Sequence, residues 1–134
     1  MNLQESVDKI VASETIVANR FYELFFERCP EVRPMFEKVN LTTQAVMLTM
    51  ALKAIREHPN ISNASKMYLQ VLGTRHQRAE IPKQLYPAFM ESLLATLQEF
   101  HGIAWDDELE RKWRDAFEAA TQLMHEGYEK RFHI

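Results

Sequence analysis

The chain has little of what builds β-hairpins or crosslinks. Its 134 residues include only three glycines and one cysteine. Apolar and polar residues show little sustained alternation, so we expect an all-helical protein rather than a sheet. The lone Cys29 excludes an internal disulfide and a cysteine-rich metal site. We expect it to be a small packing residue in a reducing compartment.

Strong charge and long apolar runs are also missing. A net charge of −3 and a pI of about 6.0 give no basic field for nucleic acid or for an anionic membrane surface. No apolar run approaches the roughly 18–20 residues needed to cross a bilayer, and no signal-like N-terminal segment is present. With 46% hydrophobic residues, the chain is expected to form one globular domain, residues 1–134, in the cytoplasm.

Apolar residues recur at helical spacing through most of the chain, which predicts about six to eight helices. We expect Thr42 and Asp106 to be N-caps and Gly73 to lie near the end of its helix. Pro87 should bend the helix that begins at Pro82. The expected segments are 2–12, 13–29, a short turn-like helix within 30–36, then 43–57, 63–77, 82–101 and a last helix after residue 106.

His76 raises a question because it ends an apolar stripe that also contains Tyr68 and Leu72. An unsatisfied ring nitrogen buried there costs about 1–3 kcal/mol. Tyr22 and Gln44 are further polar residues beside apolar positions. Each has an ordinary explanation alone: a core histidine bonded to a carbonyl, a packing tyrosine, a solvated glutamine. Together, an inward histidine opposite two polar donors across an apolar slot is what a haem site requires.

Four stretches carry a family resemblance: "FYELFFERCPEVRPMF", "QAVMLTMA", "LGTRHQRAEI" and "YPAFMESLLATLQEF". They resemble single-domain bacterial haemoglobins of the Vitreoscilla type and the globin domain of flavohaemoglobins. The separations agree as well, with 32 residues from Gln44 to His76 and 10 from His76 to Tyr86. The resemblance implies a globin fold, a three-over-three helix sandwich around haem b.

The resemblance also implies site residues. His76 would be the iron ligand, and Tyr22, Gln44 and Leu48 would lie on the opposite side and stabilise the bound gas. Arg75 would reach a haem propionate. The full set of implied cofactor contacts is Phe36, Met47, Leu48, Leu72, Arg75, His76, Ile81, Tyr86 and Phe89.

One feature of flavohaemoglobins has no clear counterpart here. They place a glutamate of the last helix beside the proximal histidine and the following tyrosine. Counting without gaps from Trp113 puts Lys130 at that position, with Glu126 and Glu129 close in sequence. The role therefore stays unassigned. We expect the other histidines, His58, His101, His125 and His133, to be structural or solvated, with His101 the next candidate ligand.

The resemblance implies reversible, high-affinity binding of dioxygen, carbon monoxide or nitric oxide, as a monomer or homodimer. One alternative is a nitric oxide dioxygenase that takes electrons from a separate reductase, since we expect no flavin or nicotinamide domain in this chain. A gas sensor and a cofactor-free helical interaction protein are further alternatives. No residue is assigned a catalytic role with certainty.

Overall fold

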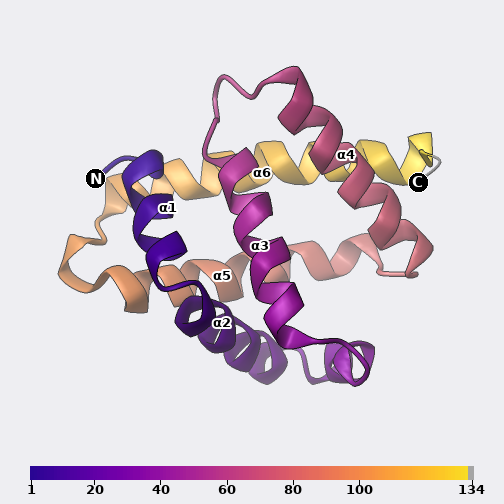
Figure 1. Ribbon diagram of the computed structural model, residues 1–134, viewed down its shortest axis with the longest axis horizontal. Coiled ribbons are helices and arrows are strands. Elements are labelled where there is room, and N and C mark those ends of the chain that lie inside the picture. Colours follow the sequence, from indigo (N-terminus) through magenta and orange to yellow (C-terminus); the bar gives the residue numbers. More distant parts are fainter. Residues whose placement is uncertain (133–134) are drawn as a thin grey trace.

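Every element in the described part of the chain is a helix. The computed structural model describes residues 1–132 (Figure 1). The elements are α1 Leu3–Ala12, α2 Glu14–Arg28, η1 Pro30–Phe36, α3 Leu41–Ile55, α4 Asn63–Arg78, η2 Lys83–Leu85, α5 Tyr86–His101, η3 Gly102–Ala104 and α6 Asp107–Lys130, where η marks a 3₁₀ helix. The all-α prediction is confirmed. Within residues 1–132, no helix combines the length and the apolar character that a membrane crossing needs.

Side-chain caps fix where α3 and α6 begin. Asp106 accepts a hydrogen bond of 2.8 Å from the backbone N–H of Leu109, so its predicted role as N-cap is confirmed. The prediction for α3 was wrong. Asn40, and not Thr42, is the N-cap, because its side-chain oxygen accepts hydrogen bonds from the N–H groups of Thr42 and Thr43 at 2.9 and 3.1 Å. The helix therefore begins at Leu41, slightly earlier than expected.

Pro30, Pro82 and Pro87 lie at or just before helix starts. The turn-like segment in 30–36 is confirmed as η1, with Pro30 at its first turn. Pro82 precedes the short η2, and α5 begins only at Tyr86. Pro87 then lies in the first turn of α5, where a missing N–H leaves no intrahelical bond unmade. The prediction that Pro87 bends a helix starting at Pro82 was wrong for this reason.

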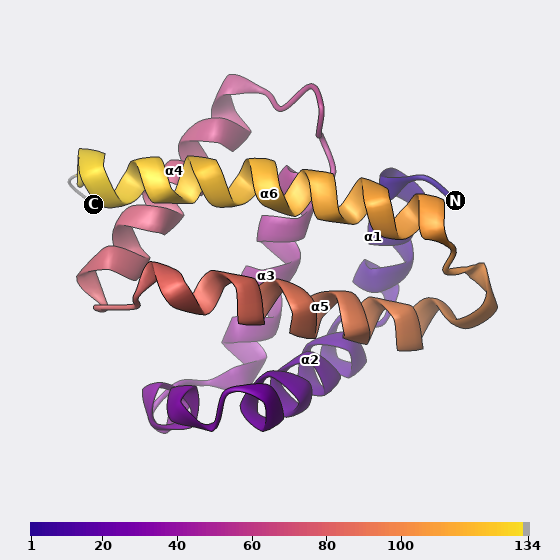
Figure 2. The same ribbon diagram turned by 180° about the vertical axis from the view of Figure 1, so that it is seen from behind.

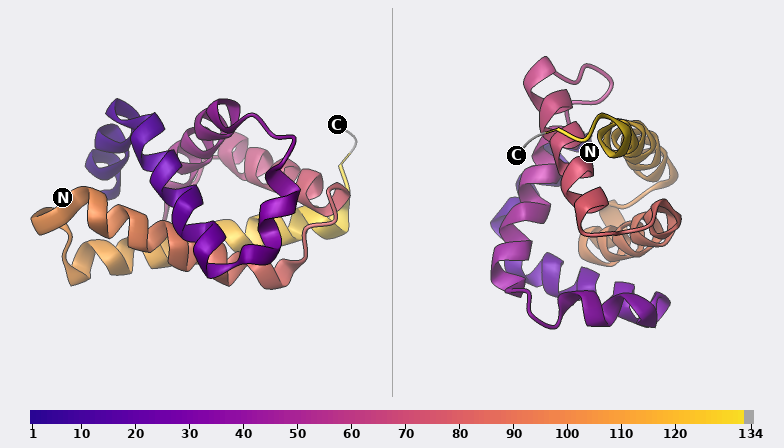
Figure 3. Two further views of the ribbon diagram at one scale, coloured as in Figure 1. Left: turned by 90° about the horizontal axis from the view of Figure 1, so that it is seen from below. Right: turned by 90° about the vertical axis from the view of Figure 1, so that its right-hand side faces the viewer.

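The helices form two crossed groups around one core. α5 and α6 run antiparallel and are joined by η3, as Figure 2 shows from behind. α4 packs along α6, and α2 packs across α5 and α3 (Figures 2 and 3). α3 contacts α1, α2, α4 and α6, so it closes the centre of the molecule. This arrangement brings the apolar stripes of most helices toward one interior.

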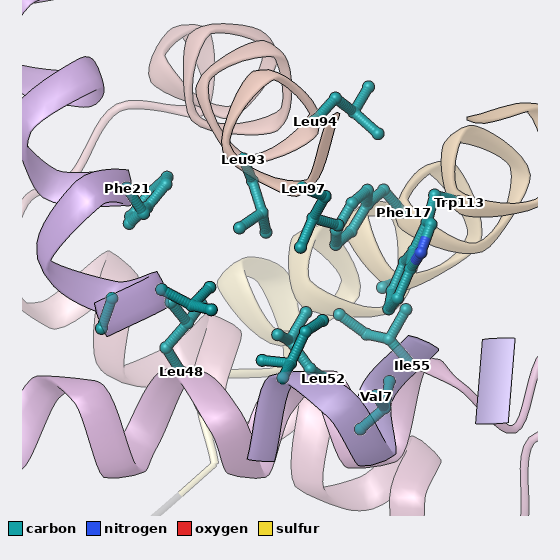
Figure 4. Packing of buried hydrophobic residues seen from close by; sticks show 14 of the residues in the cluster. Val7, Phe21, Leu48, Leu52, Ile55, Leu93, Leu94, Leu97, Trp113 and Phe117 are labelled. Carbon is teal, nitrogen blue, oxygen red and sulfur yellow. The ribbon is translucent and has the colours of Figure 1, made fainter. Parts of the chain in front are cut away.

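That interior is filled by apolar side chains from all six α-helices of the described chain, some of which Figure 4 shows. Trp113 of α6 and Leu93 of α5 are fully buried and converge with Leu52 of α3 and Phe21 of α2. Burying a large apolar side chain stabilises the fold by about 1.5–3 kcal/mol each. Each of the four lies at helical spacing from other apolar residues of its own helix.

Gly73 lies inside α4, which continues to Arg78, so its expected place near the helix end was only approximate. A Cβ atom at Gly73 would lie 1.9 Å from the carbonyl oxygen of Met124 in α6. The glycine is therefore required by a close approach of the two helices rather than by a turn.

Candidate functional site

An apolar cavity of about 170 Å³ opens between α2, η1, α3, α4, α5 and α6. It brings together most of the residues that the sequence singled out: Tyr22, Phe36, Gln44, Met47, Leu48, Leu72, His76, Ile81, Tyr86 and Phe89. Sequence reasoning did not place further wall residues here, namely Phe25, Val32, Met35, Ala51, Leu52, Ile55, Leu69, Leu85, Met90, Leu93, Phe117, Ala120, Thr121 and Met124. Their common signal was an apolar or small residue at helical spacing, which predicts burial but not a cavity wall.

His76 presents one ring nitrogen to this cavity. Its Nδ1 lies 2.7 Å from the carbonyl oxygen of Leu72, one turn earlier in α4. A carbonyl can only accept, so Nδ1 carries the proton and Nε2 keeps its lone pair. Burial lowers the pKa of His76, and the carbonyl bond opposes this in part. The ring is therefore held neutral with a free lone pair, the form in which imidazole ligates iron.

Tyr22 and Gln44 lie on other helices that wall the same cavity. The Tyr22 hydroxyl, on α2, donates a long hydrogen bond of 3.5 Å to Oε1 of Gln44, on α3. Burial raises the pKa of Tyr22 to about 12, so the hydroxyl keeps its proton at neutral pH. The other end of the Gln44 amide, Nε2, lies 3.9 Å from the sulfur of Met47. Both side chains can therefore donate hydrogen bonds within a largely apolar cavity.

Aromatic rings pack around Tyr22. Phe36, at the end of η1, packs against Tyr22 with ring centroids 5.3 Å apart and against Phe26 at 5.4 Å. Leu48 is buried in α3, one turn after Gln44. Arg75 is exposed on α4 and does not belong to the cavity wall. Its contact with a propionate stays a prediction, as do the cofactor contacts of the residues in the wall.

Tyr86 adjoins His76 on the proximal side, with ring centroids 6.1 Å apart. Its hydroxyl is buried and makes no hydrogen bond of regular geometry, and the Tyr128 hydroxyl is its polar neighbour. Burial raises the pKa of Tyr86 far above its ordinary value, and the neighbouring Tyr128 hydroxyl adds to this. The His125 ring meets Tyr86 edge-on at 4.7 Å, and its Nε2 is also buried without a partner. Tyr128 donates a hydrogen bond of 2.7 Å to the carbonyl of Ile81.

The position expected for a glutamate is thus occupied by His125 and Tyr128. Glu126 is exposed and accepts a hydrogen bond of 2.7 Å from Gln70. Glu129 and Lys130 are exposed as well. Sequence reasoning missed His125 as a neighbour of Tyr86. The sequence carried no signal for it, because Thr121, which lies one turn earlier in the cavity wall, was not predicted to line the cavity either.

His58 and His101 lie outside the cavity wall. His101 is buried, and its Nε2 lies 2.6 Å from the hydroxyl of Ser6, so its structural role is confirmed. His58 is half-buried before Pro59. His133 lies outside the described residues. Within residues 1–132, no group of three or more His, Cys, Asp or Glu side chains could hold a metal ion without a cofactor.

Comparison with known proteins decides the family. A family model described as Globin matches residues 19–124, which is most of the chain. The chain is a globin. Its helices also match two solved structures. Protein PA3967 from Pseudomonas aeruginosa PAO1 aligns with a TM-score of 0.74 at 22% identity, over 92% of this globin and 98% of that chain. Haemoglobin of the shortfin mako, Isurus oxyrinchus, aligns with a TM-score of 0.71 at 17% identity, over 97% of each chain.

The globin also resembles a longer protein. A protein named flavohemoprotein, from Halalkalibacterium halodurans, is 26% identical over 110 residues, which are 81% of the globin and 27% of that relative. The globin therefore spans about a quarter of that relative's length. The predicted globin fold and the predicted likeness to flavohaemoglobin globin domains are confirmed.

Proposed function

We propose that this globin binds haem b, with His76 as the iron ligand, and that it reversibly binds dioxygen with high affinity. When bound, haem would supply the iron atom that takes a diatomic gas. The observation that carries the proposal is the placement of Tyr22 and Gln44 with His76 in the wall of one apolar cavity. Globins as a family bind haem, and the donor set here fits it, because Nδ1 of His76 is engaged and Nε2 is free.

Different residues of the chain have different roles in this proposal. The carbonyl of Leu72 orients the imidazole of His76 and fixes its tautomer. The hydroxyl of Tyr22 and the amide of Gln44 supply donors on the distal side, and these stabilise a ligand that gains negative charge. The apolar wall excludes water, which strengthens these electrostatic contacts. Two donors in a dry pocket predict slow release of dioxygen.

The proximal partner of His76 favours gas binding over oxygen chemistry. Nδ1 donates to a neutral carbonyl, and the groups next to Tyr86 are His125 and Tyr128 rather than a carboxylate. A carboxylate partner would make the imidazole a more basic ligand. The proposal therefore ranks a nitric oxide dioxygenase with an external reductase below reversible binding of dioxygen, carbon monoxide and nitric oxide.

The decisive experiment uses the purified protein reconstituted with haem. Absorption spectra of the ferric, ferrous, dioxygen and carbon monoxide forms should show a histidine-ligated haem whose dioxygen form returns to the ferrous form when the gas is removed. Protein that takes up no haem would contradict the proposal. Sustained nitric oxide consumption, with nitrate as product and an added flavin reductase, would replace gas binding by the dioxygenase. We also propose that the globin works in the cytoplasm, as a single domain, in monomers or homodimers.

A further inference from the structure

Two glycines lie where the helix of His76 crosses α6. A Cβ atom at Gly73 of α4 would lie 1.9 Å from the carbonyl oxygen of Met124. A Cβ atom at Gly127 of α6 would lie 1.9 Å from the carbonyl oxygen of Gln70, and 2.9 Å from the backbone nitrogen of Thr74. At each glycine, the backbone of the other helix therefore occupies the space that a side chain would need. No side chain separates the two helices at this point, so their spacing is set by backbone contact.

Hydrogen bonds of the Thr74 hydroxyl stabilise the same crossing. It donates a hydrogen bond of 2.7 Å to the carbonyl of Gly127, and it accepts one of 3.3 Å from the backbone N–H of Phe132. Thr74 is completely buried, so its bond to Gly127 does not compete with solvent. These bonds fix the position of α4 along the axis of α6, and the glycine contacts fix the distance between the two helices.

The crossing is the main support of α4. α4 has its extensive helix contact with α6 and a much smaller one with α3. Gly73 and Thr74 face α6, while Leu72 and His76 line the cavity. Met124 belongs to both sides, because its carbonyl meets Gly73 and the residue is part of the cavity wall. A change in the spacing of α4 and α6 would therefore move His76 relative to that wall.

We infer that the Gly73–Gly127 crossing is a positioning device that fixes the depth of His76 in the cavity, and so sets the bond between His76 and the iron. The inference rests on the proposed function. Close-packed interiors transmit a displacement rather than absorb it, so an added methyl group at the crossing shifts the whole α4 turn. A ligand held by such a rigid support cannot adjust freely to the metal, and its supporting contacts determine how it binds.

The test uses Gly127→Ala and Gly73→Ala in the haem-loaded protein. The first measurement is the iron–histidine stretching band of the ferrous form, by resonance Raman spectroscopy. The second is the dissociation rate of dioxygen and of carbon monoxide. We expect both variants to shift the band and to change the two rates by a common factor, because a proximal change acts on both gases. Loss of a distal donor would act on dioxygen alone.

Gly102→Ala is the matched control. Gly102 has a φ of 56° and open space around the missing Cβ, at the far end of α5 from His76, so alanine there strains the backbone without touching α4. It should lower stability and leave the band unchanged. Thr74→Val keeps the side-chain volume and removes the hydroxyl bonds, so it replaces the glycine variants if these do not fold, with a smaller shift expected.

Two results distinguish failure of this inference from failure of the proposed function. Variants that fold, bind haem and lose stability, with the band and both rates as in the wild type, would show that the crossing serves packing only. A wild-type protein without any iron–histidine band would remove the proposed function itself, and this inference with it.

Discussion

The hydroxyl of Tyr22 and the side-chain amide of Gln44 lie 3.5 Å apart, on two helices that wall the same cavity as His76. The hydroxyl donates to Oε1, with the amide turned so that its oxygen faces Tyr22. Nε2 of Gln44 is then free to donate elsewhere, with the sulfur of Met47 at 3.9 Å as a weak acceptor. The two residues therefore act as a pair. A change in either one should alter the donors offered to a ligand.

We expect the cofactor-free protein to lose stability as the pH falls from about 7 to 5. The Ser6 hydroxyl is fully buried, and its other side-chain contact is the indole N–H of Trp113 at 3.1 Å, which can only donate; Nε2 of His101 is therefore the acceptor for the Ser6 proton. His101 is therefore neutral in the fold. Burial lowers its pKa, and Lys9 and the N-terminal amine lower it further. Below the ordinary histidine pKa of 6.5 the unfolded chain binds more protons than the folded chain, so stability falls with pH.

Urea denaturation of wild type and His101→Gln at several pH values checks this. The glutamine can still accept from Ser6 and does not titrate, so the variant should show a shallower dependence on pH. His76 and His125 also have lowered pKa values, so the stability of the variant should still depend on pH in part. An identical slope in wild type and variant would show that His101 does not contribute.

Tyr86→Phe and Tyr128→Phe make a matched pair, because each removes one hydroxyl from neighbouring rings. The Tyr86 hydroxyl is buried with no hydrogen bond of regular geometry, so removing it should leave the free energy of unfolding unchanged or raise it, by up to about 1 kcal/mol. Tyr128→Phe loses the bond to the Ile81 carbonyl and should lower it by about 0.5–1.5 kcal/mol. Thermal and urea unfolding of the cofactor-free proteins measure both. A larger loss in Tyr86→Phe would mean that its hydroxyl has a partner in solution.

His76→Gly removes the proposed iron ligand and leaves space for a free imidazole. The variant should bind haem weakly and lack the histidine-ligated spectrum, because the protein's bond to iron is gone. Added imidazole should restore the spectrum. His101→Gln is the control and should keep it without imidazole. A wild-type spectrum in His76→Gly alone would move the ligand to another histidine.

Local patterns predicted most of the fold. Leu93, Leu97 and Trp113 are fully buried where helical spacing placed them, because burial follows from periodicity within one helix. The start of α3 was harder to predict, since Asn40 and Thr42 are both good N-caps and only the backbone conformation selects between them. Gly73 could not be interpreted locally. Its role depends on contact with α6 near Gly127, 54 residues later in the chain.

The candidate site was predictable in its main members and not in its surroundings. Tyr22, Gln44 and His76 do share one cavity wall. Their roles toward a cofactor stay predictions. The neighbours of Tyr86 were missed, because the side of α6 that meets α5 depends on the rotation of a long helix about its axis. A displacement of one residue turns the helix by about 100°, which decides between Glu126 outward and His125 inward.

The account's central claim is that Tyr22 holds the gas ligand opposite His76, and the dissociation rates of dioxygen and carbon monoxide from Tyr22→Phe test it most directly. Phenylalanine keeps the ring and removes one donor, so packing should survive. A hydrogen bond to a charged acceptor contributes roughly 1.5–3 kcal/mol, or about 10- to 150-fold in equilibrium. Dioxygen should therefore leave faster by about that factor, while carbon monoxide, which gains less charge, should leave at nearly the wild-type rate. Gln44→Leu should act in the same direction, more weakly. A dioxygen dissociation rate unchanged in Tyr22→Phe would contradict the account.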